Sequence, residues 1–156
     1  MAETTKTGKG ASRTEETSGW TEEEVAAMQE RAREVGAGKR RGAAAKADGE
    51  AEVRAKIAAM PEPDRSMATR IHEIVTANGP DLTPRTYYGM PAYAKDGKVL
   101  CFFQPAIKFK ARYATLGFED SANLDDGNVW ATAWALSKLT PADEKKIADV
   151  VKRAVS

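Results

Sequence analysis

The spacing of apolar residues changes near Arg85, and this change constrains the fold more than any other feature of the chain. Before that point, apolar side chains recur at the spacing of a core-facing helix, as Met67, Ile71 and Val75 do. After it, apolar and polar residues alternate, which is the pattern of a strand with one buried face. The segment that follows Thr140 returns to helical spacing. We therefore expect helices first, then strands, and then a C-terminal helix.

Three segments carry the strand pattern, and a hairpin signal precedes the first of them. Asp96 and Gly97 form the dipeptide that type I′ turns favour, and such turns join antiparallel strands. The segments are KVLCFFQ (98–104), IKFKARYAT (107–115) and VWATAWAL (129–136). The sequence thus predicts an α+β fold, in which helices pack on one face of a small antiparallel sheet.

Composition divides the chain into four parts. The first is rich in small and charged residues and lacks the apolar side chains that would offset the entropy of ordering, so we expect it to be disordered. Thr21 and Glu24 form a capping box that predicts the start of a helix. The parts are a disordered tail (1–19), an N-terminal helix (20–36), a linker (37–49) and an α+β domain (50–156).

Capping signals predict helix boundaries within the domain. A helix is expected from about Glu50 to Met60, where the segment PEPD interrupts it. Asp64 is expected to cap the next helix. Thr140 and Asp143 form a second capping box and predict the start of the last helix.

The charge balance and the single cysteine exclude several classes of protein. Lys and Arg number 24 against 23 Asp and Glu, so the chain lacks the basic excess of a polyanion binder, and nucleic acid is not expected as a partner. One cysteine, Cys101, allows no internal disulfide. No apolar run approaches the ~20 residues that a membrane span requires. We therefore expect a cytoplasmic protein with no membrane partner.

Several segments resemble a known bacterial family. They are IAAMPEPDRSMATRIHEIV (57–75), YYGMPAY (87–93), DGKVLCFF (96–103) and a lysine, Lys108, near the start of the next predicted strand. With the closing strand and helix they resemble the YdhG-like family, a domain of unknown function grouped loosely with the YjbR/CyaY-like proteins. The resemblance covers about residues 50–155.

The resemblance implies a compact α+β fold and a frataxin-like role, in which iron is handed to an iron–sulfur assembly partner. Iron is accordingly the cofactor that it implies. Relatives often carry Lys-x-His-Ile where this chain has Lys108, Phe109, Lys110 and Ala111. A charged lysine has no lone pair to offer a cation, so the chain departs from the family at the natural metal ligand.

The stretch TYYGMPAYAKDGK (86–98) is the first candidate for a ligand site. Gly89 permits a positive φ or a close approach of the backbone, and tyrosines beside a bend place hydroxyl groups at the mouth of a pocket. The candidate ligand-binding residues are Tyr88, Met90 and Tyr93. The alternative is that the stretch only turns the chain and that its tyrosines fill core and rim.

A row of cations in the second predicted strand is the other candidate. Lys108, Lys110 and Arg112 alternate with apolar residues, so a strand would present them on one face. Such a row suits a carboxylate, a phosphate or an acidic partner. The alternative is a solvated outer face whose lysines protect the sheet from aggregation.

The acidic segment FEDSANLDDGN (118–128) is the candidate metal site. Carboxylates on a loop hold hard cations such as Ca²⁺ and Mg²⁺ and bind Fe²⁺ more weakly. The segment lacks the spacing of a calcium-binding EF-hand loop, and Asp-Gly is also turn chemistry, so an ordinary loop is the alternative. The candidate ligands are Glu119, Asp120, Asp125 and Asp126.

Two single residues, His72 and Cys101, are of types that often carry chemistry. His72 is the only histidine and lies beside the apolar stripe of its helix, so we expect it to be partly exposed. No motif of nucleophilic catalysis accompanies it. Cys101 lies in an aromatic strand and is expected to be a buried hydrophobic residue.

These observations favour a non-enzymatic binding module, with an iron-chaperone-like role implied by the resemblance. Two alternatives stay open. One is a protein or enzyme that binds a small anion through Lys108, Lys110 and Arg112. The other is an interaction protein that acts through the helix following Trp20.

Overall fold

A computed structural model describes residues 20–37 and 43–156 of the chain. The predicted tail (1–19) and residues 38–42 of the predicted linker lie outside the described residues. The elements in the described ranges are α1 (Glu22–Ala37), α2 (Ala43–Ala58), α3 (Asp64–Asn78), β1 (Thr83–Tyr87), β2 (Met90–Lys95), β3 (Lys98–Gln104), β4 (Ala114–Phe118), β5 (Ala133–Leu136) and α4 (Pro141–Val155). None of these helices is both long and apolar enough to cross a lipid bilayer.

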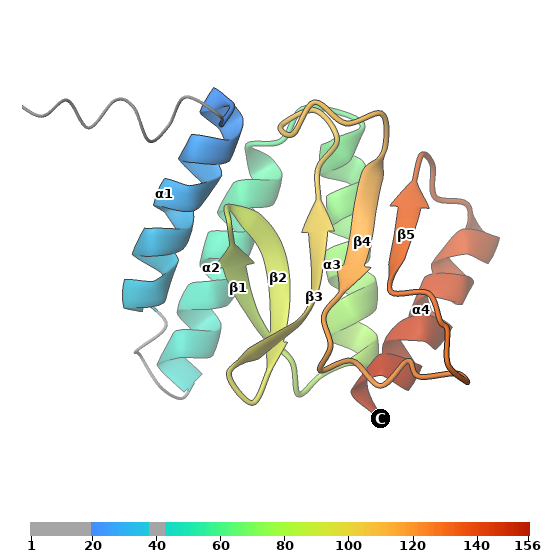
Figure 1. The fold of residues 1–156 in the computed structure, drawn as a ribbon. Helices are drawn as coiled ribbons and strands as arrows, with labels where there is room; N and C mark the ends of the chain where they lie inside the picture. Colours follow the sequence, from blue (N-terminus) through green and yellow to red (C-terminus); the bar gives the residue numbers. More distant parts are fainter. Residues whose placement is uncertain (1–19, 38–42) are drawn as a thin grey trace, which may run out of the picture.

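The strands form one antiparallel sheet in the order β1-β2-β3-β4-β5, so each strand pairs with its neighbour along the chain (Figure 1). Tight turns join the first three strands, and both central residues of each turn have positive φ, the mark of type I′. These residues are Tyr88 (51°) and Gly89 (76°), then Asp96 (52°) and Gly97 (80°). The predicted α+β fold and the predicted hairpin at Asp96-Gly97 are confirmed, whereas the Tyr88-Gly89 turn shows why the first candidate stretch bends.

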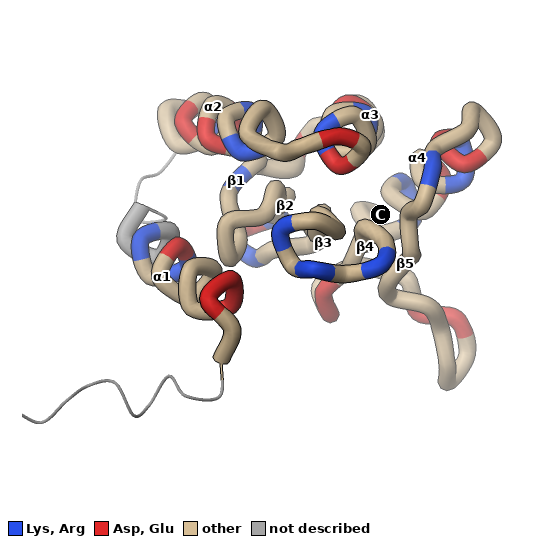
Figure 2. The backbone as a smooth tube through the Cα atoms, turned by 90° about the horizontal axis from the view of Figure 1, so that it is seen from above, with Lys and Arg blue, Asp and Glu red and all other residues tan. Residues whose placement is uncertain are grey.

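The helices lie in two places relative to the sheet. Viewed from above in Figure 2, α2, α3 and α4 form one layer on one side of it, which is the helix-covered face that the sequence predicts. The N-terminal helix, α1, precedes the predicted domain. It lies beside β1, on the side of the sheet away from α2.

The core fills the space between the sheet and the layer of three helices. Tyr93 of β2 and Phe103 of β3 are fully buried there with Ile71 of α3 and Val151 of α4. Cys101 is buried beside them, as the sequence predicts, and burial raises the pKa of its thiol to about 12. The thiol therefore stays protonated at neutral pH and acts as a small apolar side chain.

Both predicted capping boxes are present. In α1, the backbone N–H of Thr21 donates to Glu24 Oε2 at 2.9 Å, and the N–H of Glu24 donates to Thr21 Oγ1 at 3.1 Å. In α4, Thr140 and Asp143 make the same reciprocal pair. Each box satisfies backbone donors that the first turn of a helix leaves unpaired.

The second helix begins earlier than the sequence predicts. It starts at Ala43 rather than at about Glu50, so the described part of the predicted linker is helical. The alanines in this segment favour a helix, which outweighs the cost of Gly49. Gly49 itself lies where α2 comes closest to β1, because an added Cβ would lie 2.0 Å from the carbonyl oxygen of Pro84.

The predicted strand over residues 107–115 is wrong. Residues 106–110 form turns, with a positive φ of 53° at Lys110, residues 111–113 are irregular, and β4 begins only at Ala114. Asp64 explains the difference, since its Oδ2 accepts the backbone N–H of Ile107 at 2.9 Å. The same contact corrects the prediction that Asp64 caps α3, because Pro63 is the N-cap residue and makes no side-chain capping bond.

The last strand is also shorter than predicted. It covers Ala133–Leu136 rather than 129–136. Its partner β4 ends at Phe118, whose N–H donates to the carbonyl oxygen of Thr132 at 2.7 Å. Residues before Thr132 therefore extend beyond the end of β4 and have no strand there to pair with. Trp134 and Leu136 still share one face, as the alternation predicts, and Ala133 and Ala135 take the other.

We predict that Asp64→Ala lowers the free energy of unfolding by about 1–3 kcal/mol, because it leaves the N–H of Ile107 without an acceptor in a half-buried loop. Urea denaturation measures the change. Asp64→Asn keeps an acceptor oxygen at the same place and is the matched control, which should lose less stability. Equal stability of the alanine variant and the wild type would show that the bond does not hold the loop.

Candidate functional site

The Tyr88-Gly89 turn lies against a carboxylate that α1 supplies. Glu30 Oε2 is 2.9 Å from Lys56 Nζ of α2, and Glu30 Oε1 is 3.3 Å from Lys108 Nζ in the loop after β3. Segments that are far apart in the sequence thus meet at this turn. We call Glu30, Lys56, Gly89 and Lys108 the Gly89 site.

Gly89 serves the site in two ways. Its φ of 76° is a conformation that side chains with a Cβ rarely adopt. It also allows the ion pair to approach the backbone, since an added Cβ would lie 1.9 Å from Glu30 Oε2 and 2.4 Å from Lys108 Nζ. The bend therefore turns the chain and holds a carboxylate at the same position.

A cluster of aromatic rings lies next to the Gly89 site. Tyr87 and Tyr88 meet edge to face with ring centroids 4.7 Å apart, and Phe102 lies 5.9 Å from Tyr87. The guanidinium of Arg31 lies over both tyrosine rings, at 5.0 and 5.7 Å from their centroids. Burial, together with the charge of Glu119, raises the pKa of Tyr87, so its hydroxyl stays neutral at physiological pH.

The electrostatics of the Gly89 site favour a charged carboxylate. Partial burial alone would raise the pKa of Glu30, but the hydrogen bond from Lys56 and the positive charge of Lys108 outweigh it. The pKa of Glu30 consequently lies below its ordinary value. At neutral pH the site holds one negative charge between two ammonium groups.

The three predicted cations do not share a strand face, because their segment is a loop. Lys108 belongs to the Gly89 site. Lys110 contacts a different acid of α1, with its Nζ 2.8 Å from Glu23 Oε1. Arg112 is exposed and lies over the ring of Tyr113, 5.2 Å from its centroid. The prediction of one continuous cationic row is wrong, although two of its members hold α1.

Among the three candidates from the first stretch, Tyr88 alone lies in the Gly89 turn. Tyr93 is fully buried on the opposite, helix-covered face, where its hydroxyl lies 2.8 Å from His72 Nδ1. Met90 is also buried, with 6% of its surface exposed. The prediction of a partly exposed His72 is wrong, since 4% of its surface is exposed and its Nε2 lies 2.8 Å from Glu50 Oε1.

The acidic candidates do not assemble into a cluster. Glu119, Asp120, Asp125 and Asp126 lie on the irregular segment between β4 and β5. Within residues 20–37 and 43–156, no group of three or more His, Cys, Asp or Glu side chains is placed to hold a metal ion. The described residues thus offer no preformed site for the iron that the resemblance implies.

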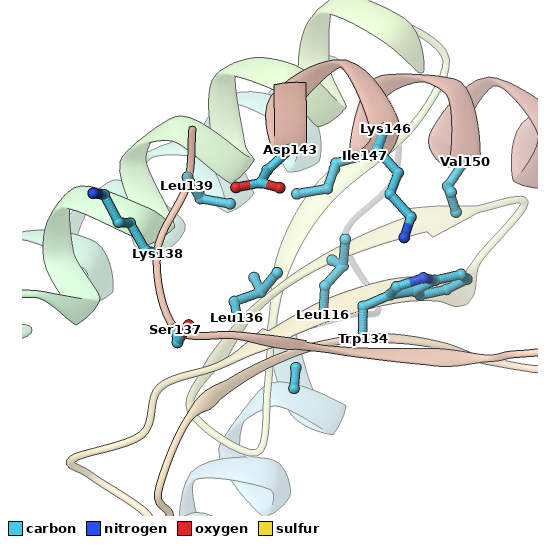
Figure 3. Close-up of a pocket in the computed structure, with 11 residues that line it drawn as sticks. Leu116, Trp134, Leu136, Ser137, Lys138, Leu139, Asp143, Lys146, Ile147 and Val150 are labelled. Carbon is cyan, nitrogen blue, oxygen red and sulfur yellow. The ribbon is translucent and has the colours of Figure 1, made fainter. Parts of the chain in front are cut away.

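A hollow of about 240 Å³ lies between β5 and α4 (Figure 3). Its walls are mostly apolar and come from both elements and from β4 beneath them. Two lysines lie at its margin, and Figure 3 shows that Lys146 extends toward Trp134 whereas Lys138 extends away from the hollow. The large apolar side chains that line it are Leu116, Trp134, Leu136, Leu139, Ile147 and Val150.

Sequence analysis did not identify Glu30 or Lys56 as site residues. Both lie on ordinary helical segments, and charged residues on a helix most often face solvent. The one local signal in the sequence was Gly89, because a glycine there allows another group to approach the backbone closely. The sequence did not indicate that this group is the carboxylate of Glu30.

Gly89 and Gly97 allow a matched test of this close approach. Both have positive φ, but nothing lies within 4 Å of a Cβ added at Gly97. We predict that Gly97→Ala costs about 1–2 kcal/mol from backbone strain alone. Gly89→Ala should cost more and should also accelerate amide exchange in α1, because the new methyl group displaces Glu30. Similar exchange in α1 for both variants would contradict the role given to Gly89.

Acid should release α1 selectively. Because the folded state lowers the pKa of Glu30, its stabilising contribution is present above the ordinary value of about 4.3 and is lost as the pH falls through the lower folded value. We predict faster amide exchange in α1, relative to β3, between about pH 5 and pH 3. In Glu30→Gln this acid-dependent step should be reduced, and the remainder is expected from Glu23, whose pKa the hydrogen bond from Lys110 also lowers. An undiminished step in Glu30→Gln would contradict the assignment to Glu30.

Comparison of the chain with protein-family models, with curated proteins and with solved structures found no match. The YdhG-like resemblance therefore stays a prediction.

Proposed function

We propose that this protein is a non-enzymatic binding module whose Gly89 site receives an anionic group, a carboxylate above all, from a small ligand. The observation that carries the proposal is the Glu30 carboxylate itself. It occupies the position that a ligand carboxylate would take, 2.9 Å from Lys56 Nζ and 3.3 Å from Lys108 Nζ.

The chemistry of the Gly89 site supports an anion. Two ammonium groups supply charge-assisted hydrogen bonds, which are stronger than bonds between neutral groups. Gly89 keeps the backbone free of a side chain at the point of contact. The rings of Tyr87 and Tyr88 offer an apolar surface to the remainder of a ligand.

The weak attachment of α1 supports the exchange of Glu30 for a ligand. Among the side chains of α1 that the structure describes, which end at Arg33, Ala27 is the buried apolar one, whereas Met28 keeps 39% of its surface exposed and the preceding Trp20 keeps 54%. The ion pairs of Glu30 and Glu23 are partly exposed, and such pairs stabilise by about 0–1 kcal/mol each. Over residues 22–33, a ligand therefore competes with a helix segment that buries little apolar surface.

The other functions expected from the sequence have less support. An iron-chaperone-like role would need converging ligands, which the described residues do not provide. A role for α1 as an interaction helix is compatible with its exposed Trp20 and Met28. It becomes relevant when a ligand displaces α1 from the Gly89 site.

Succinate, a small dicarboxylate, tests the proposal in a titration followed by amide NMR. Glu30→Gln removes the charge of the internal competitor, so we predict that this variant binds succinate about tenfold more tightly than the wild type, a gain of about 1.4 kcal/mol. The affected amides should include Gly89 and Lys108. Adding Lys108→Met to Glu30→Gln should abolish saturable binding.

Glu23→Gln is the matched control, because it removes the other acidic contact of α1 and leaves the Gly89 site filled. It should raise the succinate affinity less than Glu30→Gln does, because it weakens the attachment of α1 but leaves Glu30 paired with Lys56 and Lys108. The proposal fails if Glu30→Gln shows no saturable change at Gly89, or if Lys108→Met leaves its succinate affinity unaltered.

A further inference from the structure

The outer edge of β5 is open. It is the last strand in the sheet order, and no other strand of the described ranges pairs with its outer side. The carbonyl of Thr132 accepts from Phe118, and the register continues through Leu116 and Trp134. Backbone polar groups alternate in direction along an antiparallel strand. Those of Ala133 and Ala135 therefore point away from β4, toward the open edge.

The hollow described above lies directly beside this edge. Figure 3 shows Trp134 and Leu136 of β5 below it, and Ile147 and Val150 of α4 above it. A strand added along β5 would direct every second side chain toward the layer of α4. One extended segment could therefore pair with the open backbone groups of β5 and insert an apolar side chain into the hollow.

The volume of the hollow matches one side chain of a peptide better than a whole small molecule. Pockets for small molecules usually measure roughly 300–1,000 Å³. The hollow measures about 240 Å³, which is below that range but large enough for one large apolar side chain. A peptide would insert a single anchor there and gain the rest of its affinity from backbone bonds to β5.

The charged side chains around the hollow indicate which residues should flank the apolar anchor of the peptide. Lys138 and Lys146 border the hollow, and neither forms a close ion pair with another described residue. Asp143 also lies there, but its Oδ2 already accepts the N–H and the hydroxyl of Thr140, at 2.9 and 2.8 Å. The hollow is therefore bordered by two cations and by one carboxylate that already caps α4. This excess of positive charge favours an acidic side chain on the partner.

We infer that β5 and the hollow beside α4 form a docking site for an extended segment of a partner protein, with one large apolar anchor next to acidic residues. The segment adds to the sheet as a further strand, its anchor fills the hollow, and its acids meet Lys138 and Lys146. This inference does not depend on the Gly89 site, which lies at the other end of the sheet, beside β1 and β2.

The test uses a short capped peptide in which two glutamates precede a phenylalanine set among alternating threonines and valines. Amide NMR of the full chain should show saturable shifts in β5 and along the facing side of α4. A second peptide with lysines in place of the glutamates should bind at least tenfold more weakly. The same loss is expected when Lys138→Glu and Lys146→Glu are combined and tested with the acidic peptide.

Ala135→Pro tests strand addition directly. It removes an outward N–H at an edge position, where proline is tolerated, and leaves the bonds to β4 intact. We expect it to reduce binding of the acidic peptide at least tenfold, whereas Ala135→Thr keeps the N–H and should bind normally. The lysine variants give an independent readout if the proline variant does not fold.

Three results would overturn the inference. The first is no saturable shift up to about 1 mM acidic peptide. The second is equal binding of the acidic and the lysine peptides. The third is a folded Ala135→Pro variant that binds the acidic peptide as tightly as the wild type does. Such a result would mean that the peptide binds elsewhere, or that it binds through its side-chain anchor without adding a strand.

Discussion

The loop after β3 supplies two of the cations that contact α1, Lys108 and Lys110, and one buried carboxylate holds that loop. Asp64, at the start of α3, accepts the backbone N–H of Ile107 at 2.9 Å. The contact keeps the chain turning after β3 and so places Lys108 where it meets Glu30. A hydrogen bond at the edge of the core thus helps to position an ion pair on the opposite face of the sheet, because Ile107 and Lys108 are neighbours in the same loop.

The two proposed sites lie at opposite ends of the sheet and are in different states. At the β1 end, the cations of the Gly89 site already hold a carboxylate of the same chain, so a ligand must displace it. At the β5 end, Lys138 and Lys146 border a hollow that no side chain of residues 20–33 or 44–156 fills. The first site is therefore suited to exchange, and the second to the addition of a further strand.

Sequence reasoning succeeded where one residue and its near neighbours decide the structure. The capping boxes at Thr21 and Thr140 and the hairpin at Asp96-Gly97 depend on residues at most three positions apart. It failed for residues 107–113, because an alternating pattern does not reveal that Asp64, 43 positions earlier, accepts the N–H of Ile107. For the candidate site, it identified Lys108 and the bend at Gly89 but neither of the other two members.

The sequence by itself determined that helices come first, then an antiparallel sheet and then a C-terminal helix, because hydrophobic period and turn chemistry act over a few residues. It did not identify β1 and β2 as strands. Only the tertiary structure decided that Glu30 meets Lys108, 78 positions away, and that His72 is buried against Tyr93. Contacts over such distances depend on how whole elements pack. A charged or aromatic side chain has the same local signature whether it faces solvent or a partner brought to it by the fold.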